Sequence, residues 1–100
     1  MNVNIQSVHF EADSKLIGYV KQKLEKLGNF NDRIIQVNVF LKLDNVVHAI
    51  KDKIAEIRVH IPKHNFFVKS TSKSFEESFD NALEAMVVVQ IKKNKERKAA

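Results

Sequence analysis

The chain has 100 residues, of which 44% are hydrophobic and 29% charged, and a domain of this length buries roughly 60–70% of its unfolded surface. It contains no cysteine, which excludes disulfides, thiolate catalysis and cysteine-ligated metal sites. No apolar run approaches the roughly 18–20 residues of a membrane helix, and the amino terminus lacks the layout of a signal peptide. We therefore expect a protein of the reducing cytoplasm with no membrane partner.

The net charge of +5 is concentrated near the carboxyl end of the chain. Residues 51–100 carry eleven Lys and Arg side chains against seven Asp and Glu, and the segment 92–98 alone carries five basic groups against one acidic group. A basic tail of this kind attracts polyanions, with nucleic acid before anionic membrane. The alternative is a solvated helix end whose lysines suit the negative end of the helix dipole. Composition leaves both interpretations open.

The first third of the chain predicts a strand followed by a helix. Val3 and Ile5 alternate with polar residues, as in a short strand. Apolar residues then recur at spacings of four, four and three, which predicts an amphipathic helix with Asp13 or Ser14 as its N-cap and its end at Gly28-Asn29. The residues of this apolar stripe are Leu16, Val20, Leu24 and Leu27. The outer face is basic, through Lys15, Lys21, Lys23 and Lys26, opposed only by Glu25.

Three strands are predicted in the middle of the chain. The first alternates from Ile35 to Leu43, with only Phe40 breaking its polar side, so one face meets a core and the other is wet. The second spans residues 56–61, and the segment 62–65 that follows predicts a turn. The last spans residues 66–70. Phe66 is predicted to be core, whereas Phe67 on the other face is ambiguous between packing and base stacking.

A second helix closes the chain. Ser74 followed by Glu77 has the form of a capping box, and apolar residues then recur at helical spacing as far as Met86. Val87–Val89 are poor helix formers, but we expect the helix to continue because no turn precedes them. The order β-α-β-β-β-α predicts an α+β two-layer sandwich, with one four-stranded sheet and two helices packed on one face. We treat 1–91 as a single α/β domain and 92–100 as its basic helix end.

No arrangement of residues predicts catalysis or metal binding. His60 is expected on the wet side of a strand and His64 in a turn, and neither has an acidic residue at the spacing of a relay or a metal site. The only glycines, Gly18 and Gly28, stand ten residues apart, which excludes a phosphate-binding glycine loop. We expect a protein that is not an enzyme and that carries no cofactor.

The lysines suggest a binding surface instead. If the two helices lie side by side, the basic outer face of the first helix and the basic end of the last form one positive ridge. A ridge without interleaved aromatic residues binds phosphates and shape rather than base sequence, as proteins do with double-stranded RNA.

The sequence resembles a known family, the ribosome hibernation-promoting factors, also called ribosome-associated inhibitors or sigma-54 modulation proteins. The similarity spans essentially the whole chain, and no single motif carries it alone. The matching segments are residues 23–27, residues 31–34 running into 36–42, the pair Ser74-Phe75 with Asp80, and residues 90–97. His48 falls where the family often has a histidine.

The resemblance implies a fold like that of double-stranded-RNA-binding domains. It also implies binding to 16S rRNA in the small ribosomal subunit, in the channel that messenger and transfer RNA occupy. The expected action is steric inhibition of translation in starved or stationary cells, without a small-molecule substrate. The rRNA-binding residues carried over are Lys23, Lys26, Arg33, Lys42, Lys92, Lys93, Lys95 and Arg97. For Arg33, pairing with Asp32 or Glu25 is an equal alternative.

The sequence departs from the family pattern in two places. It stops at Ala100, so we expect a short form without the additional domain by which long members pair ribosomes, and ribosome pairing would need a separate factor. Val87–Val89 replace an alternation of basic and apolar residues, with one extra residue after Met86. An alternative function is a protein-interaction module that regulates a transcription factor through these valines and the outer strand faces.

Overall fold

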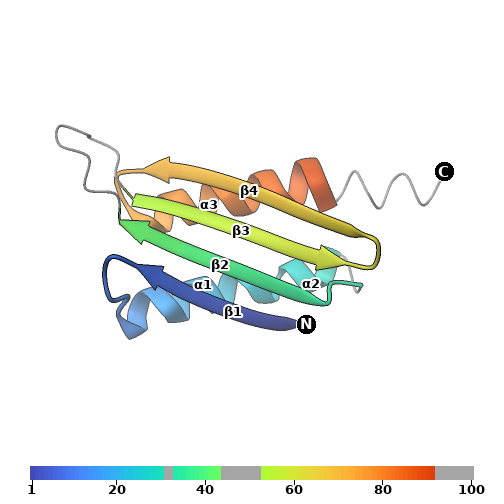
Figure 1. Cartoon of the computed structure of the whole chain (residues 1–100), viewed down its shortest axis with the longest axis horizontal. Helices are drawn as coiled ribbons and strands as arrows, with labels where there is room; N and C mark the ends of the chain where they lie inside the picture. Colours follow the sequence, from blue (N-terminus) through green and yellow to red (C-terminus); the bar gives the residue numbers. More distant parts are fainter. Residues whose placement is uncertain (31–32, 44–52, 92–100) are drawn as a thin grey trace.

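The computed structural model describes residues 1–30, 33–43 and 53–91, which form one sheet with helices on one of its faces (Figure 1). This confirms the predicted α+β two-layer fold. The elements in chain order are β1 (Asn2–Val8), α1 (Ser14–Glu25), the short α2 (Leu27–Phe30), β2 (Gln36–Leu43), β3 (Lys53–Ile61), β4 (His64–Ser72), α3 (Phe75–Ala85) and the π-helix η1 (Met86–Ile91).

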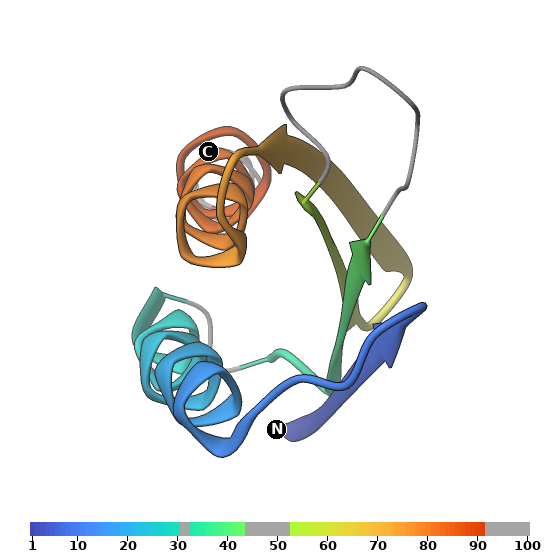
Figure 2. The same cartoon turned by 90° about the vertical axis from the view of Figure 1, so that its left-hand side faces the viewer.

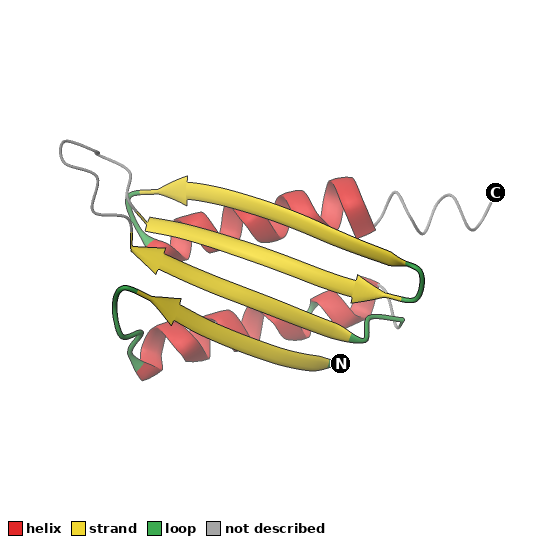
Figure 3. Ribbon diagram, in the orientation of Figure 1, coloured by secondary structure: helices red, strands yellow, loops and turns green. Residues whose placement is uncertain are grey.

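The strands lie side by side in one sheet (Figure 3). Their order is β1-β2-β3-β4, which is also the chain order (Figure 1). Strands β1 and β2 are parallel, whereas β2–β3 and β3–β4 are antiparallel. A parallel pair needs a crossover connection, and α1 and α2 lie in that crossover. The register places Val39 opposite Ile57 and Ile57 opposite Val68, so the apolar positions of neighbouring strands share one face.

That apolar face meets the helices. Figure 2 shows α1 and α3 side by side over the same side of the sheet. Burial of apolar surface between these two layers is the main favourable contribution to folding. The fully buried side chains include Val20 and Leu24 of α1, Val37, Val39 and Leu41 of β2, Ile57 of β3, Phe79 of α3 and Met86 of η1. The opposite face of the sheet carries no helix among the described residues.

The start of α1 follows the sequence, but its end does not. Asp13 is the N-cap, because its Oδ1 accepts a hydrogen bond of 2.8 Å from the backbone nitrogen of Leu16. The predicted stop at Gly28-Asn29 is wrong, since α1 ends at Glu25 and both residues belong to α2. Gly28 does not adopt a positive φ, so it does not act as a left-handed helix terminator.

Two further details of the strands correct the prediction. Ile35 is 45% exposed and precedes β2, whereas its neighbour Ile34 is buried and extends the core. The turn between β3 and β4 consists only of Pro62 and Lys63, and Lys63 holds the left-handed conformation with φ 71°. His64, predicted to lie in a turn, therefore begins β4, as does Asn65.

The closing helix begins as predicted, since the backbone nitrogen of Glu77 donates a hydrogen bond of 3.1 Å to the Ser74 hydroxyl. The prediction that a helix continues past Met86 also holds, in π form over Met86–Ile91. A π-helix has i→i+5 hydrogen bonds and so holds more residues per turn than an α-helix. This is the segment in which the resemblance described above predicts one extra residue.

Candidate nucleic-acid interface

Two of the predicted contact residues lie together at the end of α1. Lys26 is exposed and caps the helix, and Lys23 lies one turn before it with its side chain 37% exposed. Both line a shallow cleft that separates α1 and α2 from α3 and η1. Its other lining residues are Leu27, Asp80, Leu83, Glu84, Val87 and Val88. The cleft therefore has a cationic wall on the α1 side and an anionic wall on the α3 side.

Lys23 is held in place by one contact across this cleft and one within α1. Its Nζ lies 4.0 Å from Asp80 Oδ1 and 5.4 Å from the centre of the Tyr19 ring. The Tyr19 hydroxyl donates a hydrogen bond of 2.6 Å to Asp80 Oδ2, which ties α1 to α3. The hydrogen bond to Asp80, together with desolvation and the negative charges of Asp80 and Glu76, raises the pKa of Tyr19 to about 12.

The predicted positive ridge is not continuous in the described part of the chain. The helices do lie side by side, but the segment Phe75–Ala85 contributes four carboxylates and no lysine or arginine to its helix. These carboxylates are Glu76, Glu77, Asp80 and Glu84. Of these, Glu76 and Glu77 lie in the first turn of α3, where negative charge suits the positive end of the helix dipole. The basic run expected to complete the ridge, Lys92, Lys93, Lys95 and Arg97, lies outside the described residues, as does His48.

Lys42 lies on the other side of the sheet from Lys23 and Lys26. It is on the β2 positions that alternate with the buried Val39 and Leu41. Its Nζ lies 2.5 Å from Glu56 Oε2, and Glu56 is only 5% exposed. The predicted contact residues therefore do not form a single surface, because the sheet separates Lys42 from the lysines of α1.

Arg33 is exposed and lies three residues before β2. One of its two predicted pairing partners, Asp32, lies outside the described residues. Whether Arg33 contacts RNA or pairs within the chain therefore stays a prediction with both alternatives.

The sequence prediction missed a cluster on the open face of the sheet. We call it the aromatic–arginine cluster, formed by Phe40, Arg58 and Phe67. The guanidinium carbon of Arg58 lies 5.3 Å from the Phe40 ring centre and 5.2 Å from the Phe67 ring centre. The one sequence signal for it was aromatic residues at polar positions of the alternation, which did not reveal that they share a face with Arg58.

Other kinds of site find no support in the described residues. Within 1–30, 33–43 and 53–91, no three His, Asp or Glu side chains are grouped so as to hold a metal ion. In the same part of the chain, no helix is both long enough and apolar enough to cross a membrane.

Comparison with solved structures gives closely similar folds. The chain superposes with a TM-score of 0.83 on a ribosomal subunit interface protein from Coxiella burnetii, at 17% identity, covering 95% of this chain and 98% of the other. It superposes with a TM-score of 0.79 on the N-terminal domain of Thermus thermophilus Protein Y, at 24% identity, covering 94% and 99%. No curated protein sequence matches the chain.

The fold is that of a small α+β two-layer protein, with a basic surface on α1. Residues 3–99 match the family described as Sigma 54 modulation protein / S30EA ribosomal protein. Because the match covers nearly the whole chain, the chain belongs to this family, and the resemblance read from the sequence is confirmed.

Proposed function

We propose that this protein is a ribosome hibernation factor that binds the small ribosomal subunit in the messenger and transfer RNA channel and inhibits translation under starvation. The family match over residues 3–99 carries the proposal. It is supported by the fold shared with a protein named as a ribosomal subunit interface protein. The protein would act in the cytoplasm, without a catalytic step.

The inhibition we propose is steric. A rigid domain is held on rRNA by contacts between its cations and phosphates, in a place through which substrates must pass. Lys23 and Lys26 are the described residues best placed for such contacts, because Lys26 is exposed and Lys23 is held by Tyr19 and Asp80. Arg33, Lys42, Lys92, Lys93, Lys95 and Arg97 complete the proposed contact set.

Binding to purified small subunits across a salt series tests this proposal. With about six phosphates neutralised, the logarithm of the association constant falls with the logarithm of salt concentration at a slope of roughly −4 to −5. The double variant Lys23→Gln/Lys26→Gln should lower the size of this slope by about 2, because each phosphate contact contributes about 1. Sedimentation of the protein with the subunits measures both quantities.

Lys63→Gln is the matched control, because Lys63 is an exposed lysine in the turn between β3 and β4 and lies outside the predicted contact set. It should leave the slope unchanged. Binding that is insensitive to salt, or a double variant that behaves like the control, contradicts the electrostatic mechanism.

A regulator of a transcription factor is the second candidate function. The family description names sigma 54, and Val88 is 57% exposed at the edge of the cleft between α1 and η1. A protein partner that docks there would lose affinity with Val88→Asp and keep it when Lys93, Lys95 and Arg97 are replaced with glutamine. The rRNA-binding proposal predicts the opposite pattern on small subunits.

A further inference from the structure

The open face of the sheet, which is the face opposite the helices, carries a half-exposed aromatic side chain beside an arginine. Phe67 is 50% exposed and the side chain of Arg58 is 58% exposed, and the register places the two residues directly opposite each other. A single exposed apolar residue is ordinary on a protein surface. Here the aromatic ring is combined with a fixed cation and a hollow, and this combination indicates a binding site.

The cation of this site, Arg58, is held in position by the buried carboxylate of Glu56. Glu56 lies 3.8 Å from the Arg58 guanidinium and 2.5 Å from Lys42 Nζ, and it is 5% exposed. A buried carboxylate is stable only when it is paired, so Glu56 restrains the two cations that cover it. Arg58 is thereby held between the rings of Phe40 and Phe67 with much of its side chain in solvent.

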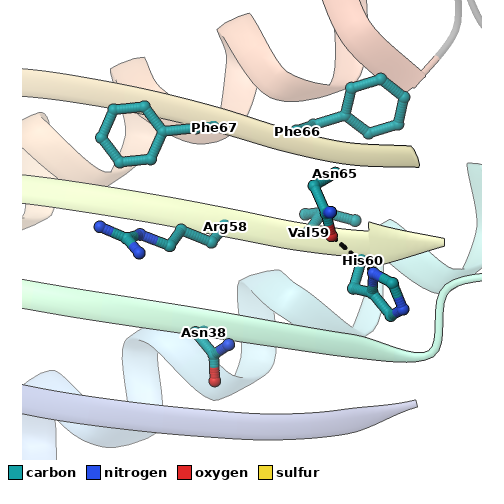
Figure 4. Close-up of a pocket in the computed structure, with 7 residues that line it drawn as sticks. All are labelled: Asn38, Arg58, Val59, His60, Asn65, Phe66 and Phe67. Carbon is teal, nitrogen blue, oxygen red and sulfur yellow. Dashed lines mark hydrogen bonds between the residues drawn. The ribbon is translucent and has the colours of Figure 1, made fainter. Parts of the chain in front are cut away.

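A hollow of about 430 Å³ adjoins this pair, a size within the range of small-ligand pockets. Figure 4 shows its arrangement: Phe67 and Arg58 lie toward one end, and His60 and Asn65 lie toward the other, with Asn38 on the neighbouring strand. His60 and Asn65 share a hydrogen bond of 2.5 Å, and Asn38 Oδ1 accepts one of 2.9 Å from Gln36. The planar groups of Phe67 and Arg58 at one end of the hollow therefore face the hydrogen-bonding side chains at the other end.

The charges and the polarity of this face select the class of ligand. Among the residues that the structure describes, Lys42, Arg58 and Lys69 lie on it against one carboxylate, Glu56, so the face favours an anion. The remaining open-face positions of β1 and β2 are largely amides, which stay hydrated and do not form the dry core of a protein interface. The amide positions are Asn2, Asn4, Gln6, Gln36 and Asn38. A planar, anionic ligand with hydrogen-bonding edges fits these properties.

We propose that this hollow binds an unpaired base of single-stranded RNA. The base stacks on Phe67 and Arg58, its edge faces Asn38, His60 and Asn65, and its phosphates lie toward Lys42 and Lys69. Stacking of bases on aromatic rings and guanidinium planes is how proteins recognise unpaired RNA. The site lies on the opposite face of the sheet from Lys23 and Lys26 and shares only Lys42 with the contact set proposed above. It is therefore a second RNA-binding surface, and its test does not depend on the proposed function.

Two octamers of equal charge test the site, namely single-stranded octaadenylate RNA and the same backbone with abasic sugars. Phe67→Ala should weaken binding of octaadenylate roughly 5- to 150-fold, because stacking contributes about 1–3 kcal/mol per base. It should leave binding of the abasic octamer unchanged. Phe67→Tyr keeps a stacking ring and should restore the affinity, and Lys63→Gln controls for a general loss of charge. Fluorescence anisotropy of labelled octamers measures all of these affinities.

Equal affinity of the native protein for the two octamers would overturn the proposal, as would an equal loss for both with Phe67→Ala. Self-association that Phe67→Ala abolishes, without preference for octaadenylate, would assign this face to a second copy of the chain instead. Lys23→Gln/Lys26→Gln should retain octaadenylate binding. Failure of small-subunit binding and failure of base stacking are therefore distinguishable.

Discussion

At the scale of single residues, Glu56 shows how tertiary contacts change the meaning of a sequence pattern. Alternation along β3 predicts it on the wet face, and it does lie on the face opposite the helices. It is nevertheless only 5% exposed, and the cations of Lys42 and Arg58 lie beside it. Its burial depends on Lys42 of β2, which is a separate strand in the sequence. No pattern along β3 alone therefore predicts that Glu56 is buried.

Tyr19 provides a residue-scale prediction that can be measured directly, because it is the only tyrosine of the chain. Its phenol should titrate with a pKa of about 12, since the hydrogen bond to Asp80 and the nearby carboxylates favour the neutral form. Asp80→Asn should lower this pKa toward the ordinary value near 10. Ultraviolet difference absorbance of tyrosinate against pH gives both values.

Glu77→Gln serves as the control for that titration, because it removes an exposed carboxylate of α3 that does not perturb Tyr19. The raised pKa of Tyr19 also has a consequence for stability. The stabilisation is fully present below about pH 10, the pKa in the unfolded chain, and is lost as the pH rises through the folded value of about 12. A tyrosine that titrates near 10 in the folded wild type contradicts the contact with Asp80.

At the scale of elements, the sequence predicted all four strands and both long helices, but several ends were wrong and α2 was not predicted as a separate helix. The apolar stripes of α1 and α3 and the alternation in β2 and β3 appear in the structure as buried faces. The end of α1 and the extent of the β3–β4 turn depend on which residues adopt a left-handed conformation. Here Lys63 does so, and neither Gly28 nor Asn65 does. Intrinsic preference is weaker than tertiary context at such positions.

The N-terminus of α1 gives a prediction at this scale, since the sequence left Asp13 and Ser14 as equal candidates for the cap. The structure assigns the cap to Asp13 through its bond to the Leu16 nitrogen. Asp13→Ala should therefore lower the free energy of unfolding by about 1 kcal/mol. Urea denaturation measures this as a lower midpoint with an unchanged m-value.

Ser14→Ala is the matched control for the cap, because Ser14 is exposed and is the first residue of the helix rather than its cap. Its effect on the free energy of unfolding should stay within about 0.5 kcal/mol. An equal or larger loss with Ser14→Ala would show that the cap has been assigned to the wrong residue.

At the scale of the whole molecule, the two faces of the sheet lie in different environments, and two phenylalanines report on them. Phe79 is fully buried between the layers, whereas Phe67 is half exposed on the open face. Phe79→Ala should lower the free energy of unfolding by about 3–5 kcal/mol, because it leaves a cavity. Phe67→Ala should cost less than about 1 kcal/mol, since it removes mainly an exposed contact with Arg58.

Thermal unfolding of the two variants checks this difference, since about 1 kcal/mol shifts the midpoint by roughly 4–8 °C in a domain of this size. The same measurement supports the choice of Phe67→Ala for the RNA experiments, because that variant must remain folded. Similar losses for both phenylalanines would mean that the open face is part of the core.

The candidate sites were predictable to different degrees. The pattern of lysines on one helix predicted the surface around Lys23 and Lys26, because residues three and four apart share a helix face. The sequence did not reveal that carboxylates of α3 face these lysines across the cleft. It also did not reveal that Lys42 lies on the opposite face of the sheet from them. The aromatic–arginine cluster was missed because its three residues come from three different strands.

The sequence by itself determined the order of the elements, the buried stripe of each, the basic outer face of α1 and the family resemblance. All of these depend on residues close together in the chain, where spacing fixes which side chains share a face. Only the tertiary structure decided that Tyr19 meets Asp80 across 61 residues, and that Arg58 lies between Phe40 and Phe67. Strand register and helix docking set those contacts, and a shift of register by one residue would move every such side chain to the other face.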